Sequence, residues 1–507
     1  MTNHRRVAWN MIWNWAGMAA SILAAFFLAR ILVERLGDAG YGLWILIASL
    51  NGYFGLLDLG VRGAVGRNMA CARARRETHA VNALLSTALA LLCIPALLAL
   101  LGTGVALTVF FHLFDVPAVF AADVRLALLI TGLGLALTIV LSAFDAALWS
   151  MQRFDVLNAI DLPVTVLRVA LTCLAVAGPG DLVPLAWATL LCALAGGLAK
   201  AVATFACDPA ARISPRLVER SAVRGLLTFG CWSWLLSVSR MATAQAGPVL
   251  IGAWLSVAAV TPFHIAARLV ASFSSLLVAG SGVLTPLAAG LHATDRHDSQ
   301  RRLVLDGGKC CFALALFFAG FALCLGDAFL QLWMGFALDA CFAVLVVLTL
   351  GELLPLSQWV GVTVMVGKGR HGLLACAGIV ENALTLGLAA CLLGTHGTVG
   401  MAVALAVPAF LCRGVFQLVV VCRTVGVPVS QYVREALLPP LAAAAAPIAA
   451  LLLLDSWRYP ENWGELVAYG ALYTIGYASS GAFVLVPLSM RAKVIGRLQR
   501  LLPRWAP

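Results

Sequence analysis

The chain has 507 residues, of which 62% are hydrophobic and only 11% are charged, and its formal net charge is +11. Soluble domains carry roughly a quarter charged residues, so this composition excludes an ordinary soluble protein and indicates a chain whose solvent is mostly lipid. The basic residues flank long apolar runs and form no separate polar domain, which argues against nucleic-acid binding.

Long apolar runs recur from one end of the chain to the other, and a spanning helix needs roughly 20 mostly apolar residues. We therefore expect an all-α integral membrane protein with about 14 spanning helices. The runs are 8–32, 40–57, 80–101, 124–148, 157–177, 182–205, 226–255, 260–291, 310–325, 340–366, 373–393, 399–422, 436–454 and 466–488. The basic start of the chain leads into the first run without a small-residue cleavage site, so that run is interpreted as a spanning helix.

A polar segment interrupts the series after the sixth run. We expect the following organisation: a six-helix lobe at 1–206, a cytoplasmic linker at 207–224, a second six-helix lobe at 225–425, and two additional helices with a basic tail at 426–507.

The seventh and eighth runs resemble the first and second at an offset of about 220 residues, as in transporters built from repeats. In this comparison, the stretch Gly40-Tyr41-Gly42-Leu43-Trp44 lies opposite Pro262-Phe263-His264-Ile265. Both stretches are expected to open a helix after a short outer loop.

Basic residues concentrate at the two ends of the chain and in alternate loops. Arg73, Arg75 and Arg76 lie in the second loop, whereas odd-numbered loops such as 178–181 are short and poor in basic residues. By the positive-inside rule, both termini are expected to face the cytoplasm.

The 14 cysteines lie mostly inside apolar runs, with no CxxC and no Cys/His cluster at metal-ligand spacing. We therefore expect neither a metal site nor a disulfide framework. No Walker A motif and no hydrolase motif is present, so we expect no direct ATP coupling and no enzymatic activity. No cofactor is expected beyond a coupling H⁺ or Na⁺.

Three of the arginines inside predicted spans stand out, because an ionisable residue there costs roughly 2.5–3.5 kcal/mol and tends to face the bundle interior. They are Arg168, Arg240 and Arg268, and His264 lies one turn before Arg268. Because a guanidinium binds phosphate in bidentate fashion and stays charged, these four residues are predicted to bind an anionic, phosphate-bearing substrate. The alternative is that each arginine pairs with a carboxylate or a helix carbonyl and only holds helices together.

Three carboxylates are candidates for coupling to an ion. Asp58 ends the second run, and Arg62 lies four residues on, so a structural ion pair near the interface is the favoured alternative there. Glu352 and Glu381 lie deeper, and each is expected either to bind H⁺ or Na⁺ or to neutralise an arginine.

Several short motifs occur in a family-specific order: Asn14, Gly40-Tyr41-Gly42-Leu43-Trp44, Gly55-Leu56-Leu57-Asp58-Leu59-Gly60, Met151-Gln152-Arg153-Phe154 through Asn158, and Gly394-Thr395-His396-Gly397 through Gly400 followed by Pro408. In these motifs the chain resembles the polysaccharide flippases of the multidrug/oligosaccharidyl-lipid/polysaccharide (MOP) exporter superfamily.

The resemblance implies two six-helix lobes in a V, as in MATE transporters, around a cationic cavity. It implies export of undecaprenyl-pyrophosphate-linked repeat units across the bacterial inner membrane, for O-antigen lipopolysaccharide or exopolysaccharide. Transport would be driven by an ion gradient or the membrane potential, with a polysaccharide polymerase and a chain-length regulator as partners.

Three other functions are alternatives to oligosaccharide flipping. A lipid-linked peptidoglycan-precursor flippase also needs a cationic cavity. A cation-coupled multidrug exporter of the same superfamily favours acidic and aromatic cavity residues over arginine. A membrane glycosyltransferase or polymerase needs a large outer loop with catalytic carboxylates, and the predicted outer loops are too short.

Overall fold

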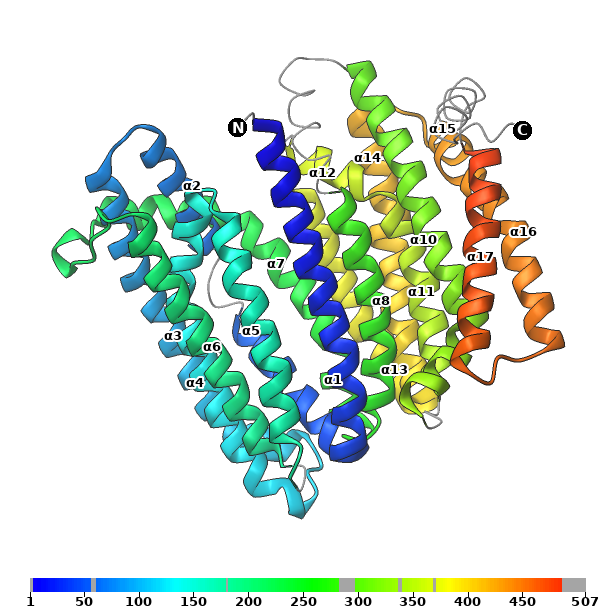
Figure 1. The fold of residues 1–507 in the computed structure, drawn as a ribbon, viewed down its shortest axis with the longest axis horizontal. Coiled ribbons are helices and arrows are strands. Elements are labelled where there is room, and N and C mark those ends of the chain that lie inside the picture. The colour runs from blue at the N-terminus through cyan, green and yellow to red at the C-terminus, as the bar shows by residue number, and fades with distance from the viewer. Residues whose placement is uncertain are drawn as a thin grey trace, which may run out of the picture. The chain divides into compact units, whose positions relative to one another are not determined.

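The computed structural model describes residues 3–55, 61–178, 181–281, 297–335, 340–367 and 371–485, with side chains described except at 3–16, 61–63, 220–236, 279–281, 297, 366–367 and 371. Within this part of the chain all regular elements are helices (Figure 1). Each predicted apolar run overlaps a described helix, so the all-α membrane fold expected from the sequence is confirmed.

The first part of the chain forms eight helices: α1 Asn3–Phe54, α2 Val61–Ala74, α3 Thr78–Leu113, α4 Ala121–Ser150, α5 Phe154–Ala175, α6 Leu182–Cys207, α7 Arg220–Trp254 and α8 Val260–Ser281. Helix α1 contains two predicted runs, which are separated at Gly37. Gly37 has φ 68° and ψ 175°, a conformation that interrupts a helix and that glycine adopts without a Cβ clash. Helix α2 lies in the second predicted loop, where no helix is expected from the sequence.

The rest of the chain continues with α10 His297–Met334, α11 Cys341–Ser357, α12 Trp359–Gly367, α13 His371–Pro408, a π-helical segment Ala409–Phe416, α14 Gln417–Val425, α15 Val429–Tyr432, a second π-helical segment Val433–Leu437, α16 Leu438–Trp457 and α17 Trp463–Val484. Helix α13 is broken at Gly397, which has φ 58° and lies between two predicted runs. Helices α11 and α12 meet at a bend of 47° and together correspond to one run.

Nine helices of the described chain are long and apolar enough to cross a membrane, and the α11–α12 pair adds a tenth if it counts as one span. Two of the nine include the breaks at Gly37 and Gly397, so each of these covers two predicted runs. Large apolar side chains such as Leu174 and Val202 are exposed on these helices, as expected where the surroundings are lipid.

The chain divides into two compact units. Unit 1 comprises Met1–Ile265 and His371–Ala404, and unit 2 comprises Ala266–Arg370 and Leu405–Pro507. The lobe and linker boundaries expected from the sequence stay a prediction.

In unit 1, α4 packs between α3 and α6 through small residues. A Cβ at Gly132 of α4 would lie 2.3 Å from Thr103 Oγ1 of α3, and a Cβ at Gly197 of α6 would lie 2.4 Å from Leu141 Cδ1 of α4. Close approach at small residues is how membrane helices gain packing energy. Helix α2 buries Val65 and Met69 against the same core.

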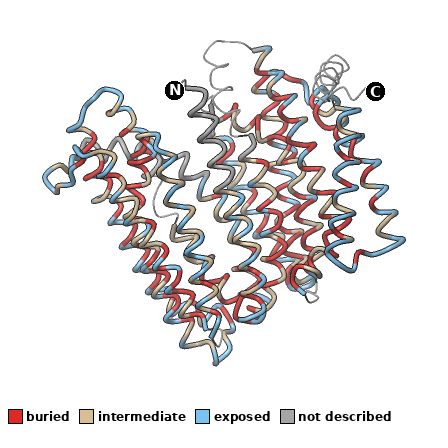
Figure 2. The backbone as a smooth tube through the Cα atoms, in the orientation of Figure 1, coloured by how far each residue is buried: buried red, intermediate tan, exposed pale blue. Residues whose placement is uncertain are grey.

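In unit 2, α10 packs against α11, α16 and α17. Tyr473 and Tyr477 of α17 donate hydrogen bonds to the carbonyls of Phe317 (3.1 Å) and Ala313 (2.6 Å) on α10. The remaining faces of α16 and α17 are largely exposed (Figure 2). Helix α17 is therefore fixed to α10 by one tyrosine-bearing stripe, whereas α16 packs on α10 and buries small and apolar residues such as Ala443 and Leu451.

Candidate functional site

Three charged side chains from three neighbouring helices of unit 1 form a compact group, which we call the triad. Lys200 Nζ of α6 lies 2.7 Å from Asp145 Oδ1 of α4 and 2.8 Å from Asp161 Oδ1 of α5. The Lys200 and Asp145 side chains are only 14% and 19% exposed, whereas Asp161 is 54% exposed. All three residues lie inside helices with spanning length and hydropathy, where ionisable groups mark functional sites by default.

The triad holds one ammonium between two carboxylates. Asp145 takes part in a further interaction, but within the described chain the carboxylate of Asp161 has no partner except Lys200. The triad therefore contains one carboxylate oxygen that is able to accept a proton.

The helices around Asp161 add few charges. Helix α1 packs on α5, and its residues 7–29 include no ionisable side chain. On α5 itself, Asp155 and Arg168 lie six and seven residues away from Asp161 on either side, and Asp155 is paired with Arg153. Lys200 is therefore the cation that pairs with Asp161.

A second charged group lies in unit 2. Arg413 of the π-helical segment donates to both oxygens of Glu352 of α11, at 2.7 Å and 3.1 Å. Bidentate arginine–carboxylate pairs are among the strong hydrogen-bonded ion pairs. Of the two alternatives expected for Glu352, this geometry is the one in which it neutralises an arginine, although Arg413 was not among the predicted candidates.

The predicted substrate-binding arginines lie on three different helices. Arg168 is exposed on α5 beside the Cys192 thiol, and Arg268 is exposed on α8. Within the described chain, neither of these two arginines has a carboxylate partner. Arg240 is exposed on α7 and is not without a partner. Arg168 and Arg240 belong to unit 1 and Arg268 to unit 2, so a shared cavity stays a prediction.

The other predicted residues fall at different places. Glu381 of α13 is buried, at 2% exposure, and is not without a partner. Its neighbour Asn382 fastens α13 to α7, because its Nδ2 donates to Ser239 Oγ (2.9 Å) and its Oδ1 accepts from Thr243 Oγ1 (3.0 Å). Asp58 lies outside the described residues.

His264 contacts a residue of the stretch that the internal repeat places opposite its own. Tyr41 Oη of α1 lies 3.2 Å from His264 Nδ1, and Thr261 Oγ1 of α8 donates to the Asp38 carbonyl at 2.8 Å. Both pairs are separated by 223 residues. These two contacts join α1 to the first turns of α8. His264 is engaged in this helix contact, and its role in substrate binding stays a prediction.

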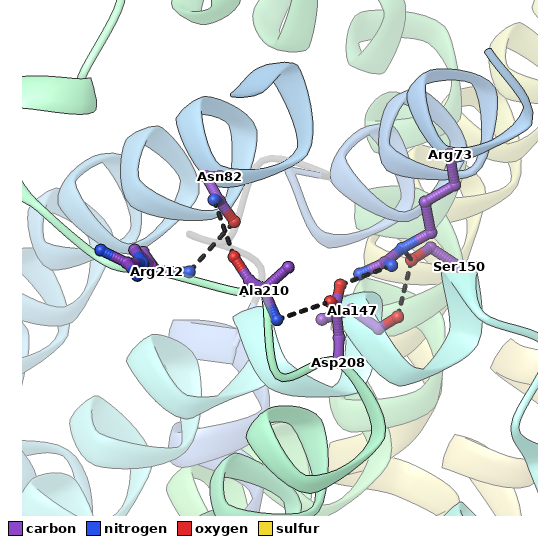
Figure 3. A network of polar contacts seen from close by, with 7 residues as sticks. All are labelled: Arg73, Asn82, Ala147, Ser150, Asp208, Ala210 and Arg212. Atoms are coloured by element: carbon purple, nitrogen blue, oxygen red, sulfur yellow. Dashed lines mark hydrogen bonds and ion pairs between the residues drawn. The ribbon is translucent and has the colours of Figure 1, made fainter. Parts of the chain in front are cut away.

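The segment after α6 is held against α2, α3 and α4 (Figure 3). Arg73 Nη1 pairs with Asp208 Oδ2 at 2.6 Å, and Arg73 Nε donates to Ser150 Oγ at 3.2 Å. Asn82 of α3 donates to the Ala210 carbonyl and accepts from the Arg212 amide, both at 3.0 Å. The polar linker expected between the lobes therefore begins as an ordered strap along α3.

Sequence reasoning did not single out Asp145, Asp161, Lys200 or Arg413. Each of them lies inside a predicted apolar run, and the cost of burying a charge in lipid marks such residues. A charge inside an apolar run was therefore a usable signal for all four residues. Pairing across 55 residues, from Asp145 to Lys200, is a property of helix packing that spacing does not reveal.

Comparisons with known proteins agree with one another. Residues 5–292, more than half of the chain, match the family described as "Polysaccharide biosynthesis protein". A stretch of 192 residues is 27% identical to the "Uncharacterized membrane protein EpsK" of Bacillus subtilis (strain 168) and covers 38% of this chain and 37% of that protein. The match thus spans little more than a third of that relative's length.

Solved structures share the fold. An inward-facing multidrug resistance MATE family transporter of the MOP superfamily has a TM-score of 0.69 at 15% identity, over 81% of this chain and 95% of that chain. The lipid II flippase MurJ, in an inward closed conformation, has a TM-score of 0.67 at 11% identity, over 94% of this chain and 98% of that chain. The MATE-like architecture expected from the resemblance is therefore confirmed.

Proposed function

Since the chain belongs to the polysaccharide biosynthesis protein family within the MOP exporter superfamily, we propose that it flips undecaprenyl-pyrophosphate-linked oligosaccharide repeat units from the cytoplasmic to the periplasmic leaflet. The product would feed the synthesis of O-antigen lipopolysaccharide or exopolysaccharide. The chain is a multi-pass membrane protein of a transporter family, and the proposed activity makes and breaks no covalent bond.

One observation supports the substrate class most directly. Arg168 and Arg268 are exposed guanidiniums inside spanning helices, and neither has a carboxylate partner within the described chain. A cation at membrane depth is costly unless it faces water or an anion. A pyrophosphate head group supplies such an anion, and arginine matches its oxygens in bidentate fashion.

In this proposal the triad binds the coupling ion, and that ion is a proton. A sodium ion would have to displace the Lys200 ammonium, which already occupies both carboxylates. A proton needs only the free oxygen of Asp161, and its binding removes one negative charge from the triad. Protonation would also weaken the ion pair that joins α5 to α6.

The test uses the purified full-length protein in vesicles that contain a fluorescent undecaprenyl-pyrophosphate-linked sugar, with flipping measured by protection from a membrane-impermeant quencher. A charged hydrogen bond is worth about 1.5–3 kcal/mol, so we expect Arg168→Ala and Arg268→Ala each to lower the flipping rate about tenfold or more. Arg434→Ala, at an exposed position on a π-helical segment, serves as the matched control. Full activity of both alanine variants would contradict the proposed substrate contacts.

The surface polymer of living cells provides the second readout. In the proposal, Arg240→Ala and Arg268→Ala abolish surface polymer without lowering the amount of protein in the membrane. The inner-membrane location, the cytoplasmic termini and the association with a polymerase and a chain-length regulator belong to the same proposal, and crosslinking in these cells tests the association.

A second candidate is the flipping of a lipid-linked peptidoglycan precursor. The observation that favours this alternative is the fold shared with the lipid II flippase MurJ over 94% of the chain. The same vesicles loaded with a lipid-linked peptidoglycan precursor separate the two functions, because the proposed function requires preference for the oligosaccharide. A cation-coupled drug exporter would instead transport a soluble cation, and exposed arginines without carboxylate partners disfavour that substrate.

A further inference from the structure

The turn between the last two helices forms a pocket with the end of α10, all within unit 2. The pocket has a volume of about 340 Å³ and is lined by Gln331 of α10 and by Tyr459, Pro460 and Glu461 of the turn. Pockets of this size, on the order of 300 Å³ and above, hold small ligands.

The turn is held in place by more contacts than a connector needs. Tyr459 Oη and Gln331 Nε2 both donate to Asp327 Oδ2, at 2.8 Å and 2.9 Å. Arg458 pairs with Glu465, whose other oxygen accepts from the Glu461 amide at 3.1 Å. Burial, followed by the hydrogen bond to Asp327, raises the pKa of Tyr459, so its hydroxyl remains a neutral donor. The pocket is therefore preorganised, which reduces the entropy cost of binding a ligand.

The free groups at the pocket suit a neutral, hydroxyl-rich ligand. Within the described chain no residue pairs with the carboxylate of Glu461, which is exposed and is able to accept hydrogen bonds from hydroxyl groups. Tyr459 is 39% exposed, and Trp457 and Trp463, which flank the turn, are 91% and 46% exposed. Exposed aromatic rings next to carboxylate and amide groups are the surfaces on which proteins hold sugar rings, because the apolar face of a sugar packs on the ring.

Other ligand classes fit less well. Asp327, Glu461 and Glu465 make the surroundings negative, and the nearby cation Arg458 is already paired with Glu465, so an anion would be repelled. The described residues include no group of three or more histidine, cysteine or acidic side chains able to hold a metal ion. An apolar ligand would leave the polar lining without hydrogen bonds.

We propose that this turn and the end of α10 form a carbohydrate-binding site. The inference rests on the proposed function for its biological meaning: the turn follows the thirteenth predicted run, so with a cytoplasmic N-terminus it lies on the periplasmic side, where the sugar of the flipped molecule emerges. The site takes one or two neutral sugar residues, and the C-terminal helices α16 and α17 hold the turn that lines it.

Saturation-transfer NMR on the full-length protein in nanodiscs tests binding without any transport step. The probes are neutral mono- to tetrasaccharides of glucose, galactose, mannose, rhamnose and N-acetylglucosamine, with inorganic phosphate as the charged comparison. We expect at least one saccharide to bind and phosphate not to compete with it. Glu461→Gln keeps the shape of the side chain but removes its charge, so we expect about tenfold weaker binding.

The matched control is Glu77→Gln, which changes an exposed carboxylate in the loop before α3. Absence of saccharide binding, or equal binding by wild type and Glu461→Gln, would overturn the site. The side of the membrane on which the turn lies is tested with Glu461→Cys, labelled by an impermeant maleimide in intact spheroplasts and compared with wild type. Protection from the label would overturn the periplasmic assignment. A protein that binds saccharide but flips no lipid-linked oligosaccharide would remove the proposed function and leave the carbohydrate site standing.

Discussion

The triad of unit 1 and the Glu352–Arg413 pair of unit 2 both place carboxylates beside cations inside spanning helices. They differ in how the charges meet. Glu352 and Arg413 meet through two hydrogen bonds, which use both oxygens of the carboxylate. The triad shares one ammonium between two carboxylates, and the second oxygen of Asp161 has no partner within the described chain. A two-point pair is suited to fastening two helices, whereas a carboxylate with a free oxygen is suited to binding a proton.

The largest effect is expected when the triad loses its cation. Lys200→Met keeps the length of the side chain but leaves the poorly exposed Asp145 carboxylate without its ammonium partner. Removing one member of a buried ion pair costs about 3–5 kcal/mol, so we expect severe loss of folded protein. Thermal unfolding followed by size-exclusion chromatography in detergent provides the measurement.

The combined variant Lys200→Met, Asp145→Asn, Asp161→Asn removes all three charges together. Because no charge of the triad then remains without its partner, we expect most of the lost stability to return while transport stays impaired. Unchanged stability of Lys200→Met alone would show that the lysine does not hold these helices together.

A smaller loss is expected from opening the Glu352–Arg413 pair. Glu352→Gln removes the carboxylate that accepts both of these Arg413 hydrogen bonds, at a cost of about 2–3 kcal/mol. We expect Arg413→Met to cost a similar amount, and the double variant to be more stable than the sum of the single changes implies. Denaturation midpoints of the three variants give the coupling energy. Additive losses would mean that the contact contributes little.

The sequence predicted the membrane class and the order of the spanning runs, but not every helix end: α3 extends to Leu113, whereas the predicted run stops at 101. Gly37 and Gly397, which break α1 and α13, both lie between predicted runs, because the apolar signal weakens where the chain turns. Helix α2 was missed because its Arg67 and Arg73 give it the composition of a loop, although its apolar side packs on α3 and α4.

The candidate site was less predictable than the fold. Hydropathy shows that Lys200 or Glu352 is unusual for its surroundings, but the choice of partner depends on which helices pack together and in which rotation. For Glu352 the sequence left two alternatives open, and only the packing of α11 against the π-helical segment brings Arg413 to it. For Arg168 and Arg268, the lack of a carboxylate partner is likewise a result of packing.

The proton assignment is tested by Asp161→Asn, which removes the free carboxylate but keeps a side chain of the same shape. Asp161 is half exposed, so we expect little change in stability. The rate of flipping driven by a pH gradient in vesicles should fall about tenfold, which corresponds to about 1.4 kcal/mol in activation free energy. The rate of flipping without a gradient should change little. A sodium gradient that accelerates wild type and not the variant would contradict the choice of ion.

The smallest effect is expected in the strap along α3, where the hydrogen bonds of Asn82 involve no ion pair. The stability cost of losing them is the reference for the costs of the two ionic groups. Asn82→Ala removes the side-chain partners of the Ala210 carbonyl and the Arg212 amide, at a cost of about 1 kcal/mol. Trypsin should then cleave after Arg212 and Arg216 sooner than in wild type, because the strap leaves α3 more often. Asn462→Ala, which removes the cap of α17 far along the chain, serves as the control and should leave this cleavage rate unchanged. If Asn82→Ala destabilises the protein as much as Glu352→Gln does, charge is not what distinguishes the two ionic groups, and the contrast between triad and pair would have to be explained by packing alone.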